Sequence, residues 1–165
     1  MPHLTDDDIY YWKEGTHTHS YERMGAHPNQ QGTWFAVWAP NAERVEVTGD
    51  FNDWSPGADV LERREGGLWE GYVRGAKPGQ KYKYHLKANG EWVDRTDPYA
   101  FQMEAPSKNT YEGLSAIIRD LDTYDWDDQD WMDQRHGPSG LNEPLSIYEV
   151  HLGSWRHKEH GESLG

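Results

Sequence analysis

Hydrophobic and polar residues alternate along residues 33–38, where Phe35 and Val37 fall on one face and Trp34 and Trp38 on the other. A repeat of two residues is typical of a β-strand, because successive side chains point to opposite faces. We expect the two tryptophans to be buried as core residues.

The same alternation returns in residues 44–48, where Val45 and Val47 are predicted to face inward. The residues expected outside are Arg44, Glu46 and Thr48. Between the two segments, Pro40 ends the first strand, because proline fixes φ and cannot donate a hydrogen bond to a neighbouring strand. The pattern therefore predicts two consecutive strands.

Residues 81–87 give the clearest strand of the chain. Its inward residues are predicted to be Tyr82, Tyr84 and Leu86, and its outward residues Lys81, Lys83, His85 and Lys87. An Asn89-Gly90 pair follows, which is the strongest short signal for a hairpin turn, and Trp92 begins the return strand. Short strands separated by turns at intervals of 8–12 residues predict an all-β, immunoglobulin-like β-sandwich over residues 31–112.

An N-terminal arm is predicted over residues 1–30, with one helical turn at Thr5–Trp12. Thr5 and Asp8 are spaced as in a capping box. The arm also contains histidines 17, 19 and 27, but no carboxylate or cysteine completes a familiar ligand spacing, so no metal site is expected. Tyr21, Met24 and Gly25 are expected to dock the arm onto the sandwich.

An acidic linker is predicted over residues 113–142, with a strand at Ile117-Ile118 and one short helix containing Trp126 and Trp131. Its aspartates lack the glycine and glutamate positions of a calcium loop. Residues 143–165 differ, because Ile147–Leu152 is almost continuously apolar. That pattern is typical of a strand buried on both faces in a parallel sheet.

Composition narrows the class of partner. The 165 residues carry a net charge of −13, which disfavours binding to nucleic acid or to an anionic membrane. The absence of cysteine excludes a disulfide framework and is compatible with the cytoplasm, where we expect the protein to reside. No signal peptide is expected, because the N-terminus lacks a basic segment followed by an apolar one. No apolar run approaches the roughly 18 residues of a membrane span.

Several motifs together resemble the N-terminal part of glycogen branching enzymes (1,4-α-glucan branching enzymes, glycoside hydrolase family 13). They are Glu14-Gly15-Thr16-His17, Gly25-Ala26-His27-Pro28, Gly49-Asp50-Phe51-Asn52 with Trp54, Tyr82-Lys83-Tyr84, and Asp97-Pro98-Tyr99-Ala100-Phe101. The resemblance implies that the sandwich is a family-48 carbohydrate-binding module. Residues 146–155, SIYEVHLGSW, resemble the first strand of that family's catalytic (β/α)₈ barrel, here truncated.

The resemblance also implies the chemistry of the parent enzyme. Such enzymes transfer α-1,4-glucan chains to form α-1,6 branches in glycogen, using two carboxyl groups on later barrel strands and no cofactor. A barrel needs about 250 residues, so this chain is predicted to contain no catalytic residue and to be inactive by itself. Asp50 and Asp53 are poor substitutes, because they share one short loop without an enclosing cleft.

The resemblance further implies a sugar platform made by Trp54 and Trp92, with Lys83 and Asn109 contributing polar contacts. The expected partner is an α-1,4-glucan such as glycogen or amylose, since flat rings pack against the C–H faces of glucose while donors reach its hydroxyls. Two alternatives remain: a structural or assembly sandwich that binds no sugar, and part of an isoamylase-type debranching enzyme. Self-association is expected through the exposed apolar strand at Ile147–Leu152.

Overall fold

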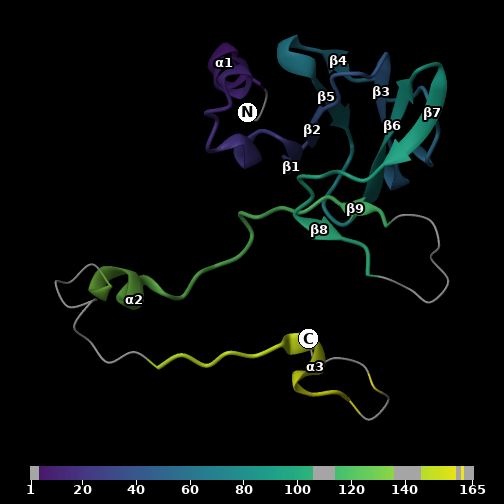
Figure 1. Cartoon of the computed structure of the whole chain (residues 1–165). Helices are drawn as coiled ribbons and strands as arrows, with labels where there is room; N and C mark the ends of the chain where they lie inside the picture. Colours follow the sequence, from purple (N-terminus) through teal and green to yellow (C-terminus); the bar gives the residue numbers. More distant parts are fainter. Residues whose placement is uncertain (1–3, 106–113, 136–145, 159–160, 162–165) are drawn as a thin grey trace. The chain divides into compact units, whose positions relative to one another are not determined.

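The computed structural model describes residues 4–105, 114–135, 146–158 and 161 (Figure 1). The chain divides into two units, residues 1–123 and residues 124–165, and each is described by itself. Within the described ranges, no helix has the length and apolar character needed to cross a membrane.

The first unit is an antiparallel β-sandwich, as predicted. Its elements are α1 (Asp6–Glu14), β1 (Gly25–Pro28), β2 (Gly32–Trp38), β3 (Arg44–Gly49), β4 (Glu62–Arg63), β5 (Leu68–Arg74), β6 (Lys81–Ala88), β7 (Glu91–Arg95), β8 (Gln102–Met103) and β9 (Ala116–Ile117), with single 3₁₀ turns at Ser20–Glu22, Asp50–Asn52 and Glu65–Gly67. The first sheet has the strand order β1-β2-β5-β4. The second has the order β3-β6-β9-β8, and β7 pairs with β6 beyond the end of β9.

The core lies between the two sheets and confirms the predicted register of β6. Tyr82 and Tyr84 are fully buried, whereas Lys83 between them is half-buried. Both tyrosine hydroxyls donate to Asp97 Oδ2, at 2.6 and 3.2 Å, so the phenols stay satisfied inside the core. Burial raises the pKa of Asp97, although these hydrogen bonds oppose that shift. Phe35 completes the aromatic centre, with its ring centroid 5.0 Å from that of Tyr82.

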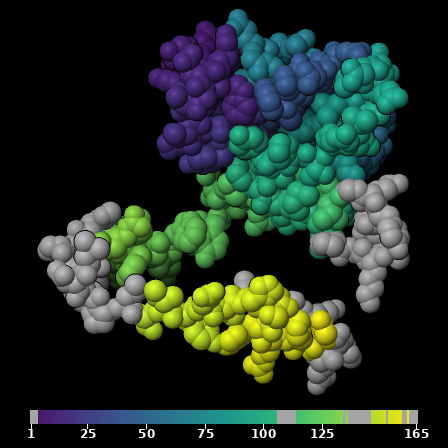
Figure 2. Space-filling view, viewed as in Figure 1, coloured from purple at the N-terminus to yellow at the C-terminus, as the bar shows by residue number. Residues whose placement is uncertain are grey.

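The N-terminal arm covers part of the outer face of the first sheet, where Ala36 and Leu68 form a second apolar cluster with residues of the arm. The buried members supplied by the arm are Leu4, Ile9 and Met24. Figure 2 shows the arm packed directly against the sandwich. The predicted docking role is confirmed for Met24 and for Gly25, which pairs with Ala36, but Tyr21 is 49% exposed and lies outside this cluster. The arm is also less separate than predicted, because β1 within it is an edge strand of the first sheet.

The tryptophans of β2 do not lie in the core, which corrects the sequence-based prediction. Trp38 is 52% exposed, its Nε1 donates to the Gly66 carbonyl at 3.0 Å, and its ring packs beside Trp12. Trp34 is half-buried and packs against Tyr72. Their alternation was read correctly, but it places them on the outer face of the first sheet, where the arm covers only part of the surface.

Glu46 and Thr48 require the opposite correction, because they were predicted to be exposed and are buried. A segment before β4 runs along the free edge of β3. There the Val47 amide donates to the Asp59 carbonyl at 2.9 Å. The Gly57 amide donates to Glu46 Oε2 at 2.7 Å. This segment removes outward-facing side chains of β3 from water, which the strand pattern alone does not reveal.

The region after the sandwich departs further from the prediction. The strand predicted at Ile117-Ile118 forms one residue earlier, as β9, and it belongs to the second sheet, so the sandwich extends beyond residue 112. In the second unit, α2 (Gln129–Gln134) contains Trp131 but not Trp126, and α3 (Leu152–Trp155) is a single turn.

The strand predicted at Ile147–Leu152 is not formed: residues 146–151 belong to no helix or strand, and Ile147 is 81% exposed. A strand is stabilised by paired neighbours. In the described part of the chain these residues have none.

Candidate carbohydrate-binding face

The outer face of the second sheet, here called the open face, carries a row of polar and aromatic side chains. On β6 these are Lys83, His85 and Lys87, and on β7 they are Trp92 and Asp94. The strands pair so that His85 lies opposite Asp94 and Lys87 opposite Trp92. Because directly opposed residues share a face, this register places Trp92 on the same side of the sheet as the predicted Lys83.

Trp92 is 43% exposed, and its indole stacks on the imidazole of His85. The ring centroids lie 4.5 Å apart and the planes differ by 5°. His85 is held in turn by Asp94, whose Oδ1 lies 2.7 Å from Nδ1. An ionised carboxylate can only accept a hydrogen bond, so Nδ1 of His85 is the donor. Neither contact was predicted from the sequence.

The hairpin that presents Trp92 has the predicted turn. Asn89 and Gly90 both adopt positive φ, at 53° and 78°, as the tight type I′ turn between twisted strands requires. The Gly90 amide also donates to Glu43 Oε1 at 3.0 Å, which ties the turn to the segment before β3. The position of Trp92 is therefore set by a backbone geometry that its own turn residues favour.

Trp54 lies in the loop after β3 and is 38% exposed. Asp53 and Trp54 have φ of 53° and 58°, a left-handed conformation that is unusual for an aromatic residue. Asn52 holds the loop, since its Oδ1 accepts from the Gly49 amide and its Nδ2 donates to the Val47 carbonyl, both at 2.9 Å. Strained backbone that is held by its surroundings clusters at functional sites.

Asp50 fixes the indole of Trp54 and links it to β6. Its Oδ1 accepts from Trp54 Nε1 at 2.9 Å, and its Oδ2 accepts from the Lys81 amide at 2.8 Å. With both oxygens engaged in this way, Asp50 serves as a support for the aromatic loop. The spacing of four residues between Asp50 and Trp54 was the available signal, but the sequence did not reveal the bond to Lys81.

The predicted sugar-binding residues lie on β6 or are attached to different positions along it. Trp54 is tethered at Lys81, Lys83 follows two positions later, and Trp92 lies opposite Lys87. At about 3.4 Å per residue, Lys81 and Lys87 are roughly 20 Å apart along the strand. Lys83 is half-buried. The fourth predicted residue, Asn109, lies outside the described residues.

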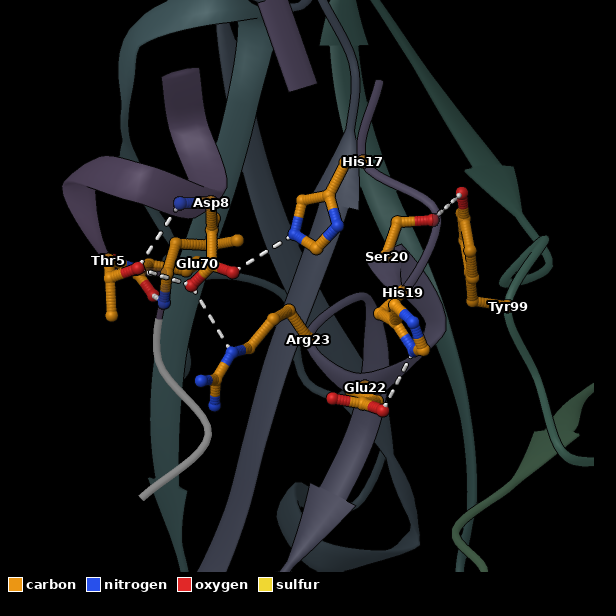
Figure 3. A network of polar contacts seen from close by, with 10 residues as sticks. Thr5, Asp8, His17, His19, Ser20, Glu22, Arg23, Glu70 and Tyr99 are labelled. Carbon is orange, nitrogen blue, oxygen red and sulfur yellow. Dashed lines mark hydrogen bonds and ion pairs between the residues drawn. The ribbon is translucent and has the colours of Figure 1, made fainter. Parts of the chain in front are cut away.

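The arm contains a second polar cluster, drawn in Figure 3, with Asp8 at its centre. The Asp8 amide donates to Thr5 Oγ1 at 3.2 Å and Asp8 Oδ2 accepts from the Thr5 amide at 2.9 Å, which confirms the predicted capping box. Its Oδ1 lies 2.9 Å from His17 Nε2, and its Oδ2 lies 3.2 Å from Arg23 Nε. Burial by itself would raise the pKa of Asp8, but the hydrogen bonds from Thr5 and His17, with the charge of Arg23, outweigh it and lower that pKa.

A cavity of about 460 Å³ opens beside this cluster. Its lining residues are Asp7, Asp8, Tyr11, Thr16, His17, Thr18, His19, Glu22 and Arg23. Both oxygens of the buried Asp8 are occupied by protein donors, so the cluster stabilises the arm.

The third histidine of the arm, His27, donates from Nε2 to the Met24 carbonyl at 2.9 Å, and burial lowers the pKa of His27. Among the residues that the structure describes, no group of three or more histidine, cysteine, aspartate or glutamate side chains could hold a metal ion.

The sandwich matches a known family of protein modules. Residues 23–100 match the model of carbohydrate-binding module 48 (isoamylase N-terminal domain), a range that spans β1 to β7. Trp54, Lys83 and Trp92 all lie inside the match, and Asn109 lies outside it. The chain therefore contains a family-48 carbohydrate-binding module, as the sequence motifs predicted.

Relatives of the whole chain identify the larger family. The chain is 81% identical, over 99% of its length, to the 1,4-alpha-glucan branching enzyme GlgB of Salinibacter ruber, and covers 26% of that protein. It is 44% identical, over 94% of its length, to the GlgB of Thermosynechococcus vestitus, and covers 20% of it. The chain belongs with the N-terminal part of the 1,4-alpha-glucan branching enzymes and spans about a fifth to a quarter of these relatives.

Solved structures agree with the sandwich fold. The catalytic module of the glycogen-degrading pneumococcal virulence factor SpuA, in complex with an inhibitor, is 26% identical with a TM-score of 0.51. The match covers 66% of this chain and 18% of that one. Pullulanase type I from Bacillus subtilis, complexed with maltose, is 25% identical with a TM-score of 0.50, covering 62% and 14% of the two chains.

Proposed function

We propose that the open face, together with the Trp54 loop, binds α-1,4-linked glucans such as glycogen or amylose. The observation that carries the proposal is the pair of partly exposed tryptophans, each held by its own support at a different point along β6. Asp50 holds Trp54 and His85 holds Trp92. The relatives are named as branching enzymes, and the matching module is named as carbohydrate-binding, which supports a glucan ligand.

The chemistry of the face fits such a ligand. Glucose units present weakly apolar C–H faces that pack on indole rings, and rigid rings lose little conformational entropy on binding. Lys83 lies between the two tryptophans along β6 and can donate to sugar hydroxyls. A neutral polymer is also indifferent to the net charge of −13. Asn109 remains a candidate for a further polar contact.

Affinity electrophoresis through glycogen-containing gels tests the proposal. We expect Trp54→Ala and Trp92→Ala each to weaken binding by more than tenfold, because a fully desolvated aromatic contact contributes about 2 kcal/mol. Lys83→Ala should weaken it less, since a solvated lysine loses rotamer entropy when it is fixed.

Trp38→Ala is the matched control, because Trp38 is an exposed tryptophan on the other sheet. Circular dichroism establishes that each variant is folded. Retardation that survives both Trp54→Ala and Trp92→Ala would favour the alternative of a structural sandwich that binds no sugar.

The proposed parent activity is transfer of α-1,4-glucan chains to form α-1,6 branches, with the module placing the glucan near a catalytic barrel. The 165-residue chain should neither branch nor hydrolyse amylose. A retaining mechanism needs an acid and a nucleophile that flank one bond, and the resemblance implies that both belong to later barrel strands. Iodine staining of amylose measures this directly. Turnover above a buffer blank would contradict the prediction. The cytoplasmic location likewise remains a prediction.

We further propose that the second unit mediates self-association. Ile147 and Tyr148 are 81% and 70% exposed in the described structure, and neighbouring apolar side chains of this kind tend to become buried against another chain. Light scattering of the full chain should give a mass above that of its own monomer, whereas a chain ending at Thr123 should give the mass of its monomer. Ile147→Ser in the full chain should reduce the association. A monomeric mass for each of the three chains would contradict the proposal.

A further inference from the structure

We propose that His85 is a positioning residue for glucan binding: it backs the indole of Trp92, so that the opposite face of that ring receives the sugar. The inference rests on the proposed function of the open face. Its basis is the near-parallel stack of the two rings, with centroids 4.5 Å apart and planes 5° apart. A ring covered on one face by a fixed partner has only the other face available to a ligand.

The sheet register explains why these two side chains meet. Trp92 lies opposite Lys87, and His85 lies opposite Asp94, so His85 and Trp92 are diagonal neighbours on the same face. Diagonal positions on paired strands are about 7–8 Å apart at the backbone, a separation that long or aromatic side chains can bridge. The contact is therefore built into the β6–β7 hairpin and does not depend on the loops.

His85 is itself fixed in place. Its side chain is only 18% exposed, and Nδ1 donates to Asp94 Oδ1 at 2.7 Å. The hydrogen bond sets the orientation of the imidazole plane, and that plane in turn sets the orientation of the indole. A partly exposed tryptophan without such a backing would populate several rotamers and lose entropy when a sugar orders it. Preorganisation by His85 reduces that loss.

The chain offers a matched control in its arm. Like His85, His19 is a surface histidine with a carboxylate partner and an aromatic neighbour. Its Nδ1 lies 3.2 Å from Glu22 Oε1, and its ring centroid lies 5.9 Å from that of Tyr21. His19 lies outside the open face. His19→Ala removes the same kind of side chain without touching Trp92.

A double-mutant cycle on glycogen affinity, measured with folded variants of the full chain, tests the role of His85. We expect His85→Ala to weaken binding about three- to tenfold, His85→Phe to restore most of the affinity by keeping a flat ring, and His19→Ala to leave it unchanged. In the Trp92→Ala background, His85→Ala should cause no further loss, because the residue it positions is absent.

The outcomes separate the two proposals. If Trp92→Ala weakens binding and His85→Ala does not, the positioning role is wrong while the glucan face stands. An equal loss from His85→Ala with and without Trp92, or no rescue by His85→Phe, also overturns the positioning role. If Trp92→Ala has no effect, the proposed face itself is wrong. NMR provides a readout free of sugar: the ring protons of His85 should be shifted upfield by the indole and return on Trp92→Ala, and an unshifted His85 would contradict the stack.

Discussion

The outer face of the first sheet and the β6–β7 part of the outer face of the second sheet are covered to different extents, although both arise from the same alternation of side chains. On the first sheet, Ala36 and Leu68 are buried beneath the arm. On the second sheet, Trp92 is 43% exposed and Lys83 and His85 are only partly covered. A strand pattern identifies which residues leave the core between the sheets, but a third layer decides which of them reach water.

The polar groups of the two faces differ in the same way. Under the arm, the buried Glu70 accepts from the Leu4 amide at 2.8 Å and pairs with Arg64. On the open face, Asp94 is 57% exposed and holds His85 beside a ring that faces solvent. Buried polar groups on the covered face stabilise the fold, whereas those on the open face orient a candidate ligand contact.

Leu68→Ala should have the largest effect on stability, because Leu68 is fully buried between the first sheet and the arm. The expected loss in the free energy of unfolding is about 2–5 kcal/mol. Urea denaturation measures it, with the exposed Leu121→Ala as control. Glycogen affinity of the folded fraction should stay unchanged. A loss below about 1 kcal/mol would mean that the arm is not a genuine third layer.

Asp8→Asn should lower the free energy of unfolding by about 1–3 kcal/mol at neutral pH, because it weakens the contacts to His17 and Arg23 on the covered face. The pKa of Asp8 is lowered from its ordinary value of 3.8, so its ionised form stabilises the fold above that pH. This contribution is lost as the pH falls through the lowered value.

The stability of Asp8→Asn should therefore decline less steeply than that of the parent between about pH 4 and the acid limit. Thermal unfolding across this range tests the difference. Asp122→Asn, on an exposed carboxylate, serves as control and should keep the acid slope of the parent. Parallel pH profiles for the parent and Asp8→Asn would show that the cluster in Figure 3 does not contribute ionic stabilisation.

Trp38→Ala should have the smallest effect, about 1 kcal/mol or less, because it removes one exposed hydrogen bond and the contact with Trp12. The variant is informative when its glycogen affinity is compared with that of Trp92→Ala. Both tryptophans are about half exposed, yet only Trp92 has a ring partner on the open face. Equal losses of glycogen affinity in the two variants would remove the distinction between the faces.

Local features of the fold could be predicted because their causes lie close together in the sequence. The inward positions of Tyr82 and Tyr84 follow from a repeat of two residues. The capping box of Thr5 and Asp8 follows from a spacing of three. The motifs around Trp54 and Trp92 likewise indicated the candidate site, and the structure places both side chains at the surface.

The errors arose where distant segments meet. Trp38 was expected in the core, but it lies on a face that only the position of the arm defines. Glu46 was expected in water, but a segment more than ten residues later covers it. The strand predicted at Ile147–Leu152 has the right side chains but lacks neighbours in the described structure. Apolar side chains indicate that burial of a segment is favourable, but they do not indicate which other segment will cover it.

The sequence by itself determined the sandwich, the inward positions of β6 and the hairpin turn before Trp92, because these depend on side-chain period and turn chemistry. Only the tertiary structure decided that Asp50 joins Trp54 to Lys81, and that His85 backs Trp92. The first contact spans about thirty positions, and the second follows from a diagonal pairing across a hairpin. Both require the chain to be folded, because hydrogen bonds and ring stacks form between neighbours in space.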